Sequence, residues 1–150
     1  MINLLKTRPP LIALLCLFAG LAADTLAPEG PPVSRIFQAL GVLPIGLGIR
    51  LMIWAVQAFE GAGIAHEPEG TPKILITGGP MRISRHPFYL GMALIMAGIG
   101  WLLVSAAVMI SGFAFALIVQ MYFIPHEEET LERLFGDEYR DYRSRVRMWL

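Results

Sequence analysis

The stretch that decides the fold is HPFYLGMALIMAGIGWLLVSAAVMISGFAFALIVQMYFIPH, residues 86–126. No Asp, Glu, Lys or Arg occurs in these 41 residues, which lie between Arg85 and Glu127. Because a helix that crosses a bilayer needs about 20 apolar residues, the stretch is long enough for two crossings. The sequence therefore predicts a tight hairpin of two membrane-spanning helices, over residues 88–104 and 106–124.

The turn of this hairpin and the residues upstream complete a prediction of four spans. Ser105 and its small neighbours form the expected turn; since they carry no charge, the turn must lie shallow in the membrane interface or be covered by protein. Two further apolar stretches, 11–23 and 36–59, are separated by the proline-rich loop 24–34. The predicted fold class is an all-α membrane protein with about four transmembrane helices in a single domain, residues 1–150.

The first apolar stretch has a second interpretation. Lys6 and Arg8 precede an apolar segment that ends in small residues, as in a cleaved signal peptide. Residues 21–23 are a poor match to an A-x-A cleavage site, which favours a retained span. A mature protein that began near Asp24 would contradict the four-span interpretation.

The positive charges lie mostly on one side of this arrangement. Of the twelve Lys and Arg residues, ten precede the first span or lie in the loop 61–87 or the tail 126–150. The positive-inside rule then predicts that both termini are cytoplasmic. The loop and the tail share that face, and they are the only polar stretches large enough to form a site. The small size favours a bacterial inner membrane, with the endoplasmic reticulum as the alternative.

The tail has a pattern of its own. From Leu131 to Val146, apolar residues recur mostly at steps of three and four, which predicts short amphipathic helices on the cytoplasmic face. Gly136 interrupts the pattern, and Asp137 follows it as a candidate N-cap. We therefore expect two short helices that lie on the membrane or fold over the loop.

Composition excludes several classes of protein. Hydrophobic residues make up 55% and charged residues 16%, against about 25% charged in typical soluble domains, which excludes a disordered chain. Twelve acids balance twelve bases, so the chain lacks the basic excess of a nucleic-acid-binding protein. The single cysteine, Cys16, cannot build a disulfide framework, and the spacing of His66, His86 and His126 matches no metal-binding motif.

The first cluster of residues that could carry chemistry is TGGPMRISRHPFYLG, residues 77–91. His86 and Pro87 begin the third span, and proline is favoured at the first position of a helix. The free N–H groups of that first turn favour an anion such as a carboxylate, and Arg82 and Arg85 add positive charge. The alternative is a simple membrane boundary, where Arg, His, Pro and Tyr are common.

The second cluster is PHEEE, residues 125–129. The helix dipole stabilises acids in a first turn, and this accounts for Glu128 and Glu129. It does not account for an acid as close to an apolar span as Glu127, which could hold an ammonium or sulfonium group. A basic helix start facing an acidic one would suit a zwitterion such as an amino acid.

Arg50 is the one charged residue inside a predicted span. A charge at that depth is costly and is usually paired or functional, so Arg50 is a candidate contact for a substrate. The alternatives are that its side chain extends toward the membrane surface or pairs with Glu60.

These residues resemble two motifs of one superfamily, the isoprenylcysteine carboxyl methyltransferases and phospholipid methyltransferases. Residues 85–91, RHPFYLG, resemble its R-H-P-x-Y-x-G motif. Glu127-Glu128-x-x-Leu131, followed by Phe135-Gly136-x-x-Tyr139-x-x-Tyr142, resembles its C-terminal E-E-x-x-L…F-G-x-x-Y-x-x-Y pattern. The resemblance covers roughly residues 70–146, and two motifs in the right order on either side of a hairpin are a specific signal.

The resemblance implies an integral-membrane methyltransferase that uses S-adenosyl-L-methionine without a Rossmann-type fold. Its acceptor would be a carboxylate, thiol or amine on an apolar or lipid-like molecule that enters between the spans, under a lid made by the tail. Arg50 and His126 are candidates to position that acceptor. The residues assigned to the cofactor are Lys73, Ile74, Leu75, Ile76, Met81, His86, Pro87, Phe88, Tyr89 and Glu127.

Two departures from the family pattern leave other functions open. Met81 stands where the family usually has an aromatic residue, although a methionine can still pack against an adenine or ribose. Prenylcysteine enzymes carry an arginine shortly before the acidic pair, and residues 122–126 contain none, so only His126 could replace it. The alternatives are a non-catalytic membrane scaffold or regulator with the same fold and a membrane reductase that uses NADPH.

Overall fold

A computed structural model describes residues 8–27, 32–62 and 74–150, and every regular element in these ranges is helical. The elements are α1 (Pro9–Asp24), α2 (Arg35–Ala39), α3 (Val42–Gly61), the 3-10 helix η2 (Gly79–Arg82), α4 (Pro87–Leu103), α5 (Ala106–Ile118), the π-helical turn η3 (Val119–Phe123), α6 (Ile124–Phe135) and α7 (Asp137–Arg145). The predicted all-helical class is confirmed for these residues.

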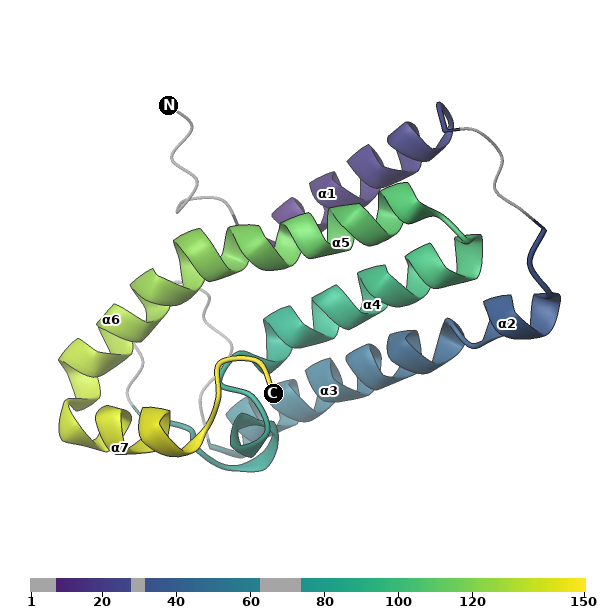
Figure 1. Cartoon of the computed structure of the whole chain (residues 1–150). Helices are drawn as coiled ribbons and strands as arrows, with labels where there is room; N and C mark the ends of the chain where they lie inside the picture. Colours follow the sequence, from purple (N-terminus) through teal and green to yellow (C-terminus); the bar gives the residue numbers. More distant parts are fainter. Residues whose placement is uncertain (1–7, 28–31, 63–73) are drawn as a thin grey trace.

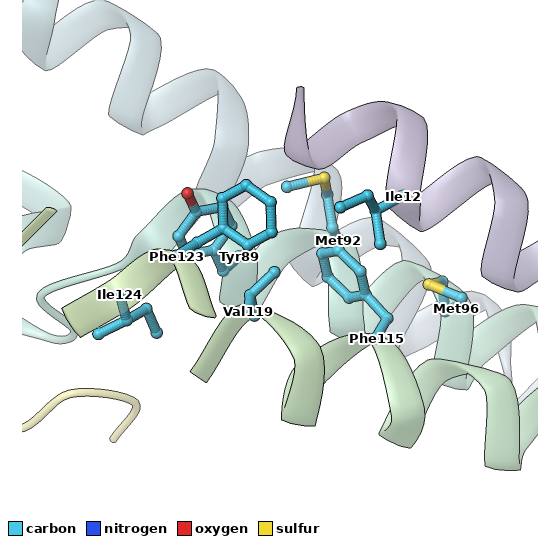
Figure 2. Packing of buried hydrophobic residues seen from close by; sticks show 8 residues of the cluster. All are labelled: Ile12, Tyr89, Met92, Met96, Phe115, Val119, Phe123 and Ile124. Carbon is cyan, nitrogen blue, oxygen red and sulfur yellow. The ribbon is translucent and has the colours of Figure 1, made fainter. Parts of the chain in front are cut away.

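The four apolar helices lie side by side in the order α1, α5, α4, α3, as Figure 1 shows. The main hydrophobic cluster joins the first three of these helices near the end where α4 begins (Figure 2). Its members are Ile12, Tyr89, Met92, Met96, Phe115, Val119, Phe123 and Ile124. The outer surfaces carry many exposed apolar side chains, as expected of helices that face lipid rather than water.

Glycines hold α3 and α4 together as an antiparallel pair. A Cβ atom added to Gly48 would lie 2.5 Å from the carbonyl oxygen of Gly91, and one added to Gly98 would lie 2.6 Å from that of Gly41. The backbones therefore touch at two levels, seven residues apart on each helix. Such close approach is typical of helices in membranes, where dispersion contacts replace the hydrophobic effect as the main attraction between helices.

The hairpin turn lies where the sequence predicts it. Val104 ends α4 in the left-handed conformation, with φ of 54°, and Ser105 caps α5 by accepting a hydrogen bond from the N–H of Val108 at 3.1 Å. The Ser105 hydroxyl also donates to Asp24, at the end of α1, and Ser105 is 2% exposed. Protein therefore covers Ser105 itself, whereas its neighbours Leu103, Val104 and Ala106 are exposed.

The ends of several helices differ from the prediction. The helix that contains the predicted fourth span does not end at residue 124, because α5, η3 and α6 form one continuous helix from Ala106 to Phe135. The predicted span 36–59 is bent by a turn between α2 and α3. Asp137 is not a cap: Gly136 occupies the N-cap position, with φ of 52°, and Asp137 is the first residue of α7.

Within the described ranges, two helices are long and apolar enough to cross a membrane, Arg35–Gly61 and Ala106–Phe135. Two shorter apolar helices, α1 and α4, have 16 and 17 residues. Residues 63–73 of the loop expected between the second and third spans, including His66 and Lys73, lie outside the described residues.

Candidate functional site

His86 lies directly before α4, between two carboxylates at the start of α6. Its Nδ1 atom is 3.4 Å from Oε2 of Glu127, and its Nε2 atom is 3.2 Å from Oε1 of Glu128. The hairpin explains this meeting, because α4 starts and α5–η3–α6 returns at the same end of the molecule (Figure 1). A buried histidine with an acid on each ring nitrogen is suited to hold a proton or a charged ligand.

Tyr89, in the first turn of α4, completes the group. Its hydroxyl donates a hydrogen bond to Oε1 of Glu127. Its ring stacks on that of His86, with the ring centres 5.8 Å apart and the planes 17° from parallel. The structure thus brings together three residues assigned to the cofactor from the sequence.

Glu128 was explained from the sequence by the helix dipole alone, and this explanation is incomplete. The residue is 5% exposed; its carboxylate accepts a hydrogen bond from Arg85 Nε at 2.9 Å and forms an ion pair with Arg85 Nη2 at 2.7 Å. Arg85 and Glu128 flank the two ends of the uncharged hairpin. Since a hairpin brings its two ends together, this flanking position was the signal that could have identified the pair.

Arg85 also holds the C-terminal end of the chain. Its Nη1 donates to the carbonyl oxygen of Val146 at 2.6 Å, and its backbone N–H donates to that of Arg147 at 3.1 Å. The Ser84 hydroxyl donates to the carbonyl of Met148 at 2.9 Å. We call residues 146–148 the C-terminal strap, because these bonds fasten them across residues 84–86.

A second hydrophobic cluster lies beneath the tail. Met81, Tyr139 and Tyr142 are buried, and the Tyr142 hydroxyl donates to the carbonyl of Met81 at 2.8 Å. Three other residues predicted to bind the cofactor pack against this cluster: Leu75, Ile76 and Phe88. The predicted packing of the tail over the loop is therefore found, and it covers the apolar part of the candidate site.

Electrostatics at the site follow from burial and from the two acids. Burial lowers the pKa of His86, but the hydrogen bonds and charges of Glu127 and Glu128 outweigh it, so the pKa is raised above its usual value. Burial raises the pKa of Tyr142 to about 12. Burial and the charge of Glu128 also raise the pKa of Tyr139, whose hydroxyl is buried without a hydrogen-bond partner among the described residues.

The remaining predicted residues lie apart from this group or at its edge. Pro87 is the buried first residue of α4, and Ile74 is exposed at the edge of the described loop. Arg50 lies two positions from Gly48, about 200° around α3 from the face that contacts α4. Its exposed side chain forms no ion pair with Glu60 or with any other acid in the described ranges.

His126 is exposed at the start of α6. In the described part of the chain it makes no hydrogen bond or ion pair, whereas its neighbour Glu127 contacts His86 and Tyr89. The two residues proposed to position an acceptor, Arg50 and His126, therefore do not meet the group around His86.

Comparison with known proteins identifies the family of this chain. Residues 36–138 match the phospholipid methyltransferase family. The chain belongs to this family. Its apolar helices and this membership indicate an integral membrane protein.

Two individual relatives are named as isoprenylcysteine methyltransferases. The chain is 39% identical over 75 residues to protein-S-isoprenylcysteine O-methyltransferase B of Arabidopsis thaliana, covering 48% of this chain and 36% of the relative. It is 33% identical over 121 residues to protein-S-isoprenylcysteine O-methyltransferase of Schizosaccharomyces pombe, covering 76% of this chain and 49% of the relative.

A third relative is an uncharacterized protein of Haemophilus influenzae, 37% identical over 62 residues, or 41% of this chain and 98% of the relative. The chain spans about a third to a half of the length of the two isoprenylcysteine methyltransferases. No solved structure is significantly similar to it.

Proposed function

We propose that this protein is an integral-membrane methyltransferase that transfers a methyl group from S-adenosyl-L-methionine to an apolar or lipid-like acceptor. The observation that carries the proposal is the group formed by His86, Tyr89 and Glu127 at the start of α4. These residues come from two motifs 38 or more positions apart, and family membership supports their common role.

The residues at this site fit such a cofactor. The side chain of Glu127 is 44% exposed, so its carboxylate is open to an ammonium group, whereas that of Glu128 is 7% exposed and occupied by Arg85. The buried hydroxyl of Tyr139, which has no hydrogen-bond partner among the described residues, lies near the charged groups of Glu128, Arg85 and Arg143.

Each residue then has a distinct task. Glu127 would hold the ammonium group, His86 and Tyr89 would keep Glu127 in place, and Met81 would pack against the adenosine. Bound S-adenosyl-L-methionine would supply an already activated methyl group. The protein has mainly to position the two reactants and exclude water, for which the packed tail is suited.

The acceptor is proposed as a class only: a carboxylate, thiol or amine on an apolar body. The names of the two isoprenylcysteine relatives suggest a prenylated cysteine. The absence of an arginine from residues 122–126 argues for a different apolar acceptor. A groove of about 490 Å³ between α3 and η2, lined in part by Trp54, Gln57 and Ile76, offers an entrance next to a residue assigned to the cofactor.

The proposed arrangement in the membrane has four spans, α1, α2–α3, α4 and α5–η3, with both termini in the cytoplasm. The bias of the Lys and Arg residues supports it. The site then lies at the cytoplasmic surface, where S-adenosyl-L-methionine is available. A bacterial inner membrane is the proposed location.

Titration calorimetry in detergent tests the cofactor site. We expect His86→Ala and Glu127→Gln each to weaken S-adenosyl-L-methionine binding about tenfold or more, since each removes a hydrogen bond to a charged group. Glu129→Gln is the matched control, because Glu129 is an exposed acid two residues after Glu127 on the same helix. Affinity like that of the wild type in both variants would refute the site, and wild-type binding of NADPH instead would favour a reductase.

A further inference from the structure

We propose that Glu128 is a positioning residue, which orients His86 and, through Arg85, fastens the C-terminal strap over the site. Its effect on the cofactor rests on the function proposed above. Its effect on the strap does not, because Ser84 and Arg85 contact the strap directly through protein atoms.

One carboxylate oxygen of Glu128 is shared by three donors. Oε1 lies 2.9 Å from Arg85 Nε, 2.7 Å from Arg85 Nη2 and 3.2 Å from His86 Nε2. The side chains of all three residues are less than a tenth exposed. An ion pair withdrawn from water to this extent is held in one geometry, so it can fix the groups bonded to it.

Glu128 and Glu127 together fix the orientation of the His86 ring. A carboxylate favours a proton on the ring nitrogen that it faces, so Nε2 is directed at Glu128 and Nδ1 at Glu127, the acid open to a ligand. Stacking on Tyr89 fixes the ring plane, while Arg85 and Arg143 are the cations beside Glu128.

Arg85 connects Glu128 to the tail. With Nε and Nη2 on Glu128, its Nη1 is left for the carbonyl oxygens of Val146, at 2.6 Å, and Arg143, at 3.4 Å. Arg143 lies in the last turn of α7, and Val146 is the first residue of the strap. Loss of Glu128 would leave the guanidinium without its anchor, and the strap without a fixed donor.

Three variants of the full chain separate these effects. Glu128→Gln removes the charge that orients both His86 and Arg85. Arg85→Lys keeps a cation beside Glu128 but lacks the planar set of donors that reaches the strap. Glu129→Gln is the control, since Glu129 is exposed and forms no ion pair in the described part of the chain.

The first measurement is limited trypsin cleavage in detergent, without cofactor, read by mass spectrometry at the arginines of the tail: Arg143, Arg145 and Arg147. We expect Glu128→Gln and Arg85→Lys to be cleaved about tenfold faster than the wild type, because cleavage requires local opening and each variant loses charge-assisted hydrogen bonds. The control should be cleaved like the wild type.

The second measurement is the pH titration of His86 by NMR with labelled histidine, the signal being assigned from its loss in His86→Gln. We expect Glu128→Gln to lower the pKa of His86 and Arg85→Lys to leave it close to the wild-type value. A purely structural role for Glu128 would not separate these two variants.

Wild-type cleavage rates in both variants, or an unchanged pKa of His86 in Glu128→Gln, would overturn the proposal. If Glu128→Gln does not fold, the double variant Arg85→Gln/Glu128→Gln removes both buried charges together and should still show rapid cleavage. A wild-type protein that binds no S-adenosyl-L-methionine would refute the proposed function, while the cleavage comparison would still decide the role of Glu128 in the strap.

Discussion

At the scale of single residues, His86 depends on its two acidic neighbours for its charge. Because Glu127 and Glu128 raise its pKa above the ordinary value of about 6.5, the folded protein holds the imidazolium form more tightly than the unfolded chain. The resulting stabilisation is complete at pH values below about 6.5 and is lost as the pH rises through the pKa of the folded state.

Thermal unfolding in detergent checks this dependence. We expect the melting temperature of the wild type to exceed that of His86→Gln by more at pH 6 than at pH 9. The same comparison between the wild type and Glu129→Gln should show no such trend, because Glu129 has no histidine partner in the described residues. A difference for His86→Gln that stayed constant, or grew, with rising pH would contradict the assigned ion pairs.

The residues of this site and their contacts could be predicted from the sequence only in part. His86, Tyr89 and Glu127 could be placed together because they flank an uncharged hairpin whose ends must meet. Glu127 was assigned to the cofactor from the sequence, but the burial of Glu128 against Arg85 could not be predicted, because both acids lie in the same helical turn. Their directions differ by about 100°, and only the packing of Arg85 shows which one is buried.

At the scale of helices, the contact between α3 and α4 depends on glycines that point at one another. Gly48→Ala should destabilise the protein by about 1–3 kcal/mol, since its Cβ would lie 2.5 Å from the carbonyl oxygen of Gly91 and would force the backbones apart. Gly46→Ala on the same helix is the control: nothing lies within 4 Å of its added Cβ, so we expect it to stabilise α3 by about 0.5–1 kcal/mol.

Thermal or denaturant unfolding of both variants in the same detergent provides the measurement. Equal effects of the two substitutions would show that the helices do not approach as closely as described. Apolar composition alone could not distinguish these glycines, because which of them faces α4 depends on the rotation of α3.

Most helices could be predicted from the sequence, but only some of their ends could. The turn at Ser105 and the break at Gly136 were found where small residues interrupt a regular pattern. The π-helical turn at Val119–Phe123 left no such mark, since its residues are as apolar as those before it. Hydropathy therefore placed the end of the span at residue 124, whereas backbone hydrogen bonding continues the helix to Phe135.

At the scale of the whole molecule, the order α1, α5, α4, α3 could not be predicted from the sequence, because neighbours in the chain are not always neighbours in space. The proposed topology can be tested with the single native cysteine removed by Cys16→Ser. In that background we expect an impermeant maleimide to label Thr25→Cys on intact spheroplasts, and Ser144→Cys only after the membrane is opened. Labelling of both positions from the same side would refute four spans with cytoplasmic termini.

The length of α4 has a consequence for where an acceptor can meet the site. Its 17 residues extend about 26 Å, which is less than the hydrocarbon thickness of about 30 Å in a typical bilayer. A helix this short draws its ends inward or thins the lipid around it. Since His86 stands at one of those ends, the reacting groups would lie at the depth where acyl chains meet the headgroups. A lipid-borne acceptor could then reach them without leaving its leaflet.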